Sequence, residues 1–211
     1  RLRLADGSLK SIGEDEIEEI ADGTSLMPAG LCDSLTAKEL IDLTAFLSNL
    51  GRTEQFSIRS DRVARGWQVL GWDQATNHLM NRTSFDSVTD GRSGLPWQQV
   101  YPLVSGAVPV ENLPSYKIHA NVPPTSFLRT VIQVSEAGSV ELLFSETAGL
   151  QLWVNGKPTP LNRKSIIVEL TAGNGEITIA VDREVVTQGL SLEVMSPDVG
   201  SAVFKLPLNL Q

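Results

Sequence analysis

Cysteine, histidine and aromatic residues are scarce in this chain of 211 residues. The single cysteine, Cys32, excludes an intrachain disulfide and any metal site built from several thiolates. The two histidines, His78 and His119, lie in no recognisable catalytic motif, and the GxSxG, phosphate-loop and dinucleotide motifs are missing. We therefore expect a protein that binds a partner rather than one that catalyses a reaction.

Positive charge and long apolar runs are also lacking. The chain has 17 Lys and Arg against 25 Asp and Glu, a net charge of -8. Nucleic acid and anionic membrane surfaces both require a cationic footprint, so neither is an expected partner. No apolar run approaches the roughly 20 residues of a membrane helix, so we expect no membrane insertion. The chain opens on Arg1 without an initiator methionine, as expected of a piece of a longer protein.

The character of the sequence changes near residue 52, which predicts two domains, residues 1–52 and 53–211. In the first, residues 2–12 alternate apolar and polar side chains around Asp6-Gly7, which predicts a β-hairpin. Residues 14–23 predict a short acidic helix that ends at a glycine. The first domain is therefore expected to hold a hairpin and two helices.

The second of these helices carries the clearest signals. Thr36 and Glu39 have the spacing of a capping box, and Gly51 fits the C-terminal stop. One face of this helix is apolar at helical spacing and consists of Leu40, Leu43, Phe46, Leu47 and Leu50. Because so small a unit rarely stabilises itself, we expect this face to pack on another part of the protein or to form a dimer.

Short strands separated by turn residues dominate the chain after residue 56. Residues 56–72 predict one or two strands, and 78–96 predict an irregular loop. Further strands are predicted at 126–135, 139–146, 149–156, 164–173, 175–182 and 190–196. Their spacing and alternation are typical of an antiparallel β-sandwich or jelly roll. The fold class is therefore expected to be mainly β.

Residues 25–51, SLMPAGLCDSLTAKELIDLTAFLSNLG, resemble the C-terminal part of c-type cytochrome domains. The resemblance is closest to the version found in large membrane-bound dehydrogenases and haem-binding proteins of planctomycete-like bacteria. The resemblance implies that Met27 is the axial iron ligand, that Pro28 positions it, and that the parent protein lies outside the cytoplasm. A Met/His axial pair suits electron transfer. The Cys-x-x-Cys-His attachment motif is absent, so we expect no haem in this chain and haem c only in a longer parent.

Residues 148–161, AGLQLWVNGKPTPL, and the strands around them resemble galactose-binding-like and protective-antigen-type β-sandwiches. Asn155-Gly156 has a structural reason in either case, because both residues tolerate the positive φ of a two-residue hairpin turn. The protective-antigen type binds calcium through adjacent acidic residues before this strand. Glu146 has no acidic neighbour here, so we do not expect a calcium-assisted sugar site.

Exposed aromatic side chains in such sandwiches stack on sugar rings or on partner side chains. Trp153 alternates with Leu152 and Val154, which predicts that it points away from the core toward solvent. Trp97 follows a proline and is expected in a loop. The candidate ligand-binding residues are Trp72, Asp73, Trp153, Asn155 and Lys157.

The sequence leaves three functions open. The first is a non-catalytic binding module, with carbohydrate or neighbouring domains as partners, at the C-terminus of an extracytoplasmic haem protein. The second is a structural β-sandwich that packs domains together and binds no small molecule. The third is a glycoside-acting enzyme, which requires two carboxylates about 5 to 10 Å apart in one cleft.

Overall fold

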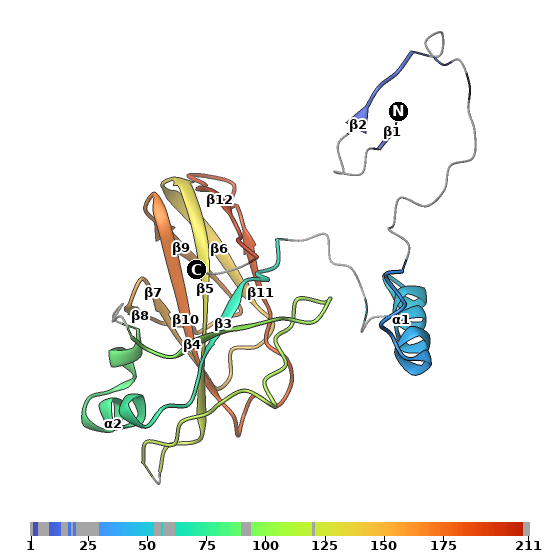
Figure 1. Cartoon of the computed structure of the whole chain (residues 1–211). Helices are drawn as coiled ribbons and strands as arrows, with labels where there is room; N and C mark the ends of the chain where they lie inside the picture. Colours follow the sequence, from blue (N-terminus) through green and yellow to red (C-terminus); the bar gives the residue numbers. More distant parts are fainter. Residues whose placement is uncertain are drawn as a thin grey trace. The chain divides into compact units, whose positions relative to one another are not determined.

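The computed structural model describes residues 2–3, 9–13, 17, 19, 30–52, 56, 62–89, 94–119 and 121–208. The chain divides into two compact units, Arg1–Asn49 and Leu50–Gln211, and each is described by itself. Figure 1 shows the elements of both units along the chain.

The first unit begins with the predicted hairpin. Strands β1 (Leu2–Arg3) and β2 (Leu9–Lys10) pair antiparallel, with Leu2 opposite Lys10 and Arg3 opposite Leu9. This pairing is shifted by one residue from that of a two-residue Asp6-Gly7 turn, which would place Arg3 opposite Lys10. The acidic helix predicted at 14–23 falls mostly outside the described residues, and its described members Ile17 and Glu19 are not helical.

Helix α1 (Ala37–Asn49) confirms the second predicted helix of this unit. The capping box is formed in both directions. The Glu39 backbone N–H donates to Thr36 Oγ1 at 3.3 Å, and the Thr36 N–H donates to Glu39 Oε2 at 2.7 Å. Gly51 follows the helix with a φ of 75°, a conformation that favours glycine. No side chain of α1 is buried, and the predicted apolar face is largely exposed.

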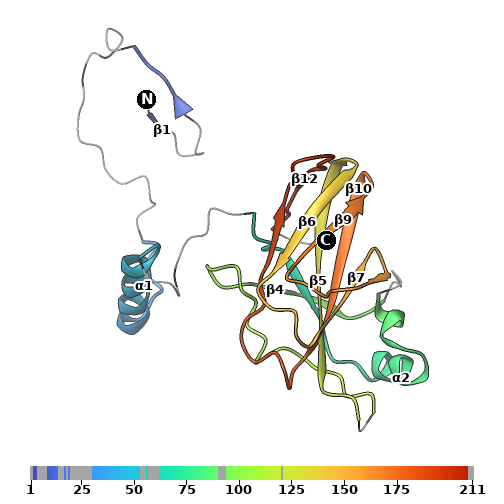
Figure 2. The same ribbon diagram turned by 180° about the vertical axis from the view of Figure 1, so that it is seen from behind.

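The second unit, the β module, is an antiparallel β-sandwich, which confirms the mainly β fold class. Its large sheet has the strand order β4-β3-β5-β10-β7-β8, with β12 paired to the last residues of β5, beyond those that pair with β3. The bounds are β3 Trp67–Leu70, β4 Trp97–Val100, β5 Thr125–Glu136, β7 Leu150–Val154, β8 Lys157–Thr159, β10 Gly173–Asp182 and β12 Val203–Lys205. The small sheet has the order β11-β6-β9, formed by Leu192–Met195, Gly138–Phe144 and Ser165–Leu170. Figures 1 and 2 show the module from opposite sides.

Six predicted strands, β5, β6, β7, β9, β10 and β11, are confirmed, and β3 lies within the predicted 56–72 segment. Strands β4, β8 and β12, each of three or four residues, were not predicted. Trp97 is therefore the first residue of a strand rather than a loop residue. The irregular loop predicted at 78–96 is wrong in part, because α2 (Gln74–Arg82) and the 3-10 helix η3 (Phe85–Val88) occupy about half of it.

The main core lies between the two sheets. Alternate residues of β5, among them Leu128, Ile132 and Val134, face it together with the apolar residues of β10 and β6. The opposite face of the large sheet carries a second, smaller core. Helices α2 and η3 lie against this outer face, so one end of the sandwich has three layers instead of two.

Candidate functional site

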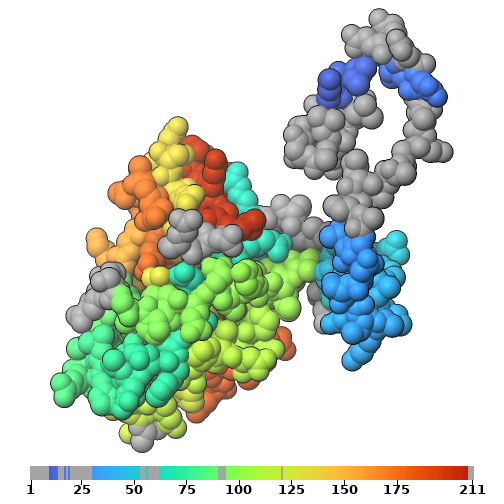
Figure 3. Space-filling model, in the orientation of Figure 1, coloured from blue at the N-terminus to red at the C-terminus, as the bar shows by residue number. Residues whose placement is uncertain are grey.

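One end of the outer face of the large sheet is covered by α2 and η3. Phe127, Trp153 and Ala180 contribute to this face from β5, β7 and β10. Strand pairing places Ala180 opposite Phe127, and Trp153 opposite Thr178 two residues along β10. The buried residues of this second core are Leu70, Met80, Val88, Tyr116, Phe127, Trp153 and Ala180. In the space-filling view, the segment that holds α2 forms a continuous surface on this part of the module (Figure 3).

Trp153 lies inside this second core, and the prediction that it faces solvent is wrong. Only 4% of the residue is exposed, and its indole Nε1 donates to Asp86 Oδ1 of η3 at 2.7 Å. The alternation with Leu152 and Val154 does place Trp153 on the face away from the main core. The α2–η3 layer buries that face, so the ring is not available to stack on a ligand.

Asp73 begins the covering layer. As the N-cap of α2 it accepts hydrogen bonds from the Thr76 N–H at 2.9 Å and from Thr76 Oγ1 at 3.0 Å. These bonds to the charged form lower the pKa of Asp73. The Asp73 backbone N–H donates to the hydroxyl of the buried Tyr116, which in turn donates to the Gly71 carbonyl. The neighbouring Trp72 is 62% exposed, as expected of a candidate stacking residue.

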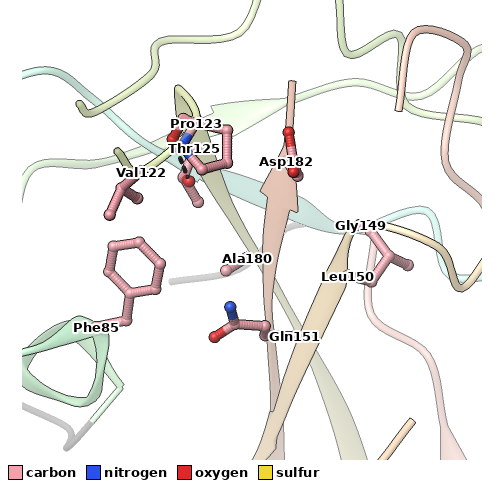
Figure 4. A pocket seen from close by; sticks show the side chains of 9 residues that line it. All are labelled: Phe85, Val122, Pro123, Thr125, Gly149, Leu150, Gln151, Ala180 and Asp182. Carbon is pink, nitrogen blue, oxygen red and sulfur yellow. Dashed lines mark hydrogen bonds between the residues drawn. The ribbon is translucent and has the colours of Figure 1, made fainter. Parts of the chain in front are cut away.

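A pocket of about 160 Å³ opens where η3 meets the ends of β5, β7 and β10 (Figure 4). We call it the η3 pocket. Its lining residues are Phe85, Val122, Pro123, Thr125, Gly149, Leu150, Gln151, Ala180 and Asp182. The volume corresponds to roughly five water molecules at about 30 Å³ each. It suits a small ring rather than a drug-sized ligand.

The chemistry of the η3 pocket combines one aromatic ring with a few polar groups. Phe85 stands on one side, held edge-on against Phe127 at a centroid separation of 5.0 Å. The exposed amide of Gln151 points toward Phe85 and Ala180 (Figure 4). Asp182 carries a carboxylate whose Oδ1 accepts the Glu184 N–H at 2.8 Å. The amide and Asp182 Oδ2 offer donors and acceptors for ligand hydroxyls beside an apolar wall.

Strand pairing brings these groups together. Ala180 is paired with Gln151 on one side and with Phe127 on the other, and Asp182 is paired with Thr125. Thr125 Oγ1 donates to the Pro123 carbonyl at 2.9 Å, which holds the loop before β5 against the pocket. Sequence reasoning missed all of these residues, because the register between β5, β7 and β10 is not visible in any one segment.

The remaining predicted ligand residues lie elsewhere. Asn155 has a φ of 50° in the turn between β7 and β8, which agrees with its expected structural role. Its N–H donates to the Glu176 carbonyl and its Oδ1 accepts the Glu176 N–H, both at 2.8 Å. Lys157 is exposed on β8. Neither of these residues, nor Trp72, lines the η3 pocket, so the structure does not gather the five candidates into one site.

A polar cluster occupies the outer face beyond the α2–η3 layer. The Arg129 guanidinium stacks 4.3 Å from the Trp97 ring, and its Nε donates to Gln68 Oε1 at 2.7 Å. Arg129 Nη1 also lies 3.5 Å from Glu176 Oε2. Burial lowers the pKa of Arg129, and the Glu176 charge opposes this shift. These contacts hold β3, β4, β5 and β10 together on the side away from the main core.

The described residues near the η3 pocket show few groups suited to catalysis or metal binding. The lining of the η3 pocket contains a single carboxylate, Asp182. His78 and His119 are both exposed, and neither lines it. Among the described residues, no group of three or more His, Cys, Asp and Glu side chains is placed to hold a metal. Glu146 Oε1 accepts the backbone N–H groups of Thr147 and Ala148, and these bonds lower its pKa.

The c-type haem attachment expected only of a longer parent needs two cysteines, and this chain has one. Met27 and Pro28 lie outside the described residues, so their implied role as axial ligand and positioning neighbour stays a prediction. The lone Cys32, which is exposed, cannot supply the two thioether bonds of a c-type attachment. None of the helices in the described part of the chain has the length and apolar character needed to span a membrane.

Comparison with known protein families finds none that matches the chain, and a search of curated proteins finds no similar sequence.

Proposed function

We propose that the β module is a non-catalytic binding module whose η3 pocket takes one sugar ring of a carbohydrate. The observation that carries this proposal is the grouping of Phe85, Gln151 and Asp182 around a pocket of about 160 Å³. An aromatic ring offers an apolar surface to the C–H face of a sugar, while amide and carboxylate groups exchange hydrogen bonds with its hydroxyls. The small volume favours a terminal or single ring over an enclosed oligosaccharide.

The placement of this module in an extracytoplasmic haem protein is part of the same proposal. It rests on the resemblance of residues 25–51 to the end of c-type cytochrome domains. The confirmed α1 helix and its Thr36–Glu39 capping box are compatible with that resemblance. In such a parent, the electron-transfer chemistry would belong to the haem domain, and the β module would supply binding.

A structural β-sandwich without a small-molecule ligand is the second candidate. The observation in its favour is the covering of the outer face by α2 and η3. This layer buries Trp153, and the pocket beside it is small. The two candidates differ in a measurable way, because a spacer domain has no reason to bind sugars saturably.

A glycan-array screen of the full chain, followed by calorimetric titration of the best ligand, tests the proposal. The informative variant is Gln151→Ala, because this exposed side chain lines the pocket. We expect it to weaken binding by about fivefold to tenfold, as for the loss of one hydrogen bond. The control is Gln133→Ala. Gln133 is an exposed glutamine of β5, on the same outer face of the large sheet but outside the pocket, so this variant should bind the ligand like the unchanged protein.

No binding across the array, or an equal loss in both variants, would favour the structural spacer. Trp153→Ala is unsuitable as a binding control, because removal of this buried ring would destabilise the whole α2–η3 layer. The enzyme hypothesis has its own readout. Release of reducing sugar from a bound glycan would replace the binding-module proposal by that hypothesis.

A further inference from the structure

A second concave surface lies in the β module, away from the η3 pocket. This groove of about 480 Å³ is lined by Arg62, Val63, Arg65, Phe204, Lys205, Leu206 and Leu208. It shares no residue with the η3 pocket. We call it the cationic groove, because three of its seven lining residues are basic and none of these seven is acidic.

The two walls of the cationic groove belong to the two different sheets. Residues 62–64 extend the small sheet, since the Ala64 N–H donates to the Leu192 carbonyl and the Val194 N–H donates to the Arg62 carbonyl, both at 2.8 Å. The opposite wall is β12 of the large sheet and the residues after it. The walls approach closely at Gly66, where an added Cβ would lie 2.3 Å from the Pro207 carbonyl oxygen. The groove is thus built on hydrogen-bonded backbone rather than on a loose loop.

The floor of the groove is apolar and its rim is charged. Val63 and Phe204 are buried in the floor, and Leu208 is exposed beside them. The Arg62 guanidinium lies 4.9 Å above the Phe204 ring and donates to Ser196 Oγ at 3.3 Å. These contacts hold the positive charge of Arg62 at the rim. A guanidinium has five N–H donors, so others are available to donate to a carboxylate of a ligand.

Arg65 is held in a similar way. Its Nη2 donates to the Val104 carbonyl at 3.0 Å, and the side chain is half-buried. Lys205 is exposed at the same groove. Three cations converge here on a protein that carries eight more acidic than basic residues, so the local field opposes that of the surface as a whole.

We propose that the cationic groove is a docking site for a short acidic peptide segment of a partner protein. Two or three carboxylates of the segment pair with the basic rim, and aliphatic side chains between them cover the apolar floor. Arginine suits this role, because its planar guanidinium binds a carboxylate through two parallel hydrogen bonds. Charge complementarity between the rim and the segment is what selects this partner.

Long polyanions fit the groove less well than a short segment. Nucleic acid affinity grows with the number of cations that contact phosphates. The groove offers three cations on a chain of net charge -8, so a long strand would also meet the acidic remainder of the surface. A short peptide contacts the groove alone. Burial of its aliphatic side chains on Val63 and Phe204 adds a contribution that a phosphate chain lacks.

Fluorescence anisotropy with the full chain tests this proposal. The probe is a fluorescein-labelled peptide in which pairs of glutamates alternate with single isoleucines, and its glutamine counterpart is the neutral control. We expect saturable binding of the acidic peptide that weakens as salt rises from about 0.01 M to 0.15 M, because screening shortens the range of the charge interaction. The glutamine peptide should not bind.

The double variant Arg62→Gln/Lys205→Gln should bind the acidic peptide about tenfold more weakly, the combined effect of two exposed charge pairs. The matched control is Lys117→Gln/Arg163→Gln, which removes the same net charge from two exposed positions outside the groove. Its affinity should stay within about twofold. Thermal unfolding of both variants checks that the β module remains folded.

Absence of peptide binding to the unchanged chain would overturn the proposal. Equal loss in the two double variants would do the same, because it would show a general charge effect instead of a site. Binding of single-stranded RNA or of anionic vesicles in place of the peptide, lost in the Arg62→Gln/Lys205→Gln variant, would assign the groove to another class of partner. None of these outcomes bears on sugar binding in the η3 pocket.

Discussion

The bond between Trp153 and Asp86 allows a sharp test of the three-layered end of the module. The indole N–H of Trp153, a residue that is only 4% exposed, donates to Oδ1 of the exposed Asp86 at 2.7 Å, across the boundary between β7 and η3. Asp86→Ala removes the acceptor and leaves this buried N–H without its partner. An unsatisfied buried donor costs about 1 to 3 kcal/mol. We therefore expect the free energy of unfolding of the β module to fall by about 2 kcal/mol.

Urea denaturation followed by tryptophan fluorescence measures this change. With a slope of about 2 kcal/mol/M, a loss of about 2 kcal/mol lowers the urea midpoint by about 1 M. Asp86→Asn keeps an oxygen acceptor in the same place, so we expect it to lose less than about 1 kcal/mol. The surface control Asp198→Ala removes an exposed carboxylate and should change stability by less than about 0.5 kcal/mol.

A double-mutant cycle separates the hydrogen bond from other effects of Asp86. Trp153→Phe removes the N–H while it keeps an aromatic ring in the second core. In that background Asp86→Ala should cost about 1 to 2 kcal/mol less than it does alone. A cost that is the same in both backgrounds, or an Asp86→Asn variant as unstable as Asp86→Ala, would refute the reasoning.

Two further predictions concern local backbone features. Hydrogen bonds from Thr36 lower the pKa of Glu39. The capping box therefore stabilises α1 at pH values above the ordinary titration range of glutamate, and this stabilisation is lost as the pH falls through the lowered pKa. Amide hydrogen exchange in the first turn of α1 should become faster on acidification, and the Glu39→Gln variant should show a weaker dependence on pH. Gly106 and Gly94 have similar positive φ values, 86° and 89°. A Cβ added at Gly106 would lie 2.2 Å from Val63 Cγ1, whereas a Cβ added at Gly94 would have no atom within 4 Å. Both alanine variants carry the backbone strain of about 1 kcal/mol, so Gly106→Ala should lower the midpoint of thermal unfolding by several degrees more than Gly94→Ala, and equal shifts would contradict the clash.

Local sequence patterns predicted the elements whose chemistry is complete within a few residues. The capping box of α1 needs only Thr36 and Glu39, and both are in the expected roles. The turn at Asn155 needs only a residue that tolerates positive φ. The long strands β5 and β10 alternate over ten residues or more, so their register to the core is readable. Strands of three or four residues and the short α2 lack such a pattern.

Trp153 marks the limit of this kind of inference. Alternation along β7 correctly separated it from Leu152 and Val154. It could not indicate whether solvent or another layer covers that face, because the covering helices begin about 80 residues earlier in the chain. The N-cap of α2 at Asp73 was present in the sequence, but only the buried contacts of Met80 and Val88 show which surface this segment covers.

The sequence alone determined the mainly β class, the strong local turns and caps, and the acidic balance of the surface, because each follows from neighbouring residues or from composition. Only the tertiary structure decided which side chains share a surface. The η3 pocket joins Phe85, Gln151 and Asp182 from a 3-10 helix and two strands, and the cationic groove joins Arg62 to Lys205 across the two sheets. Contacts of this kind depend on strand order and register, which arise from the packing of the whole sandwich and not from any one segment.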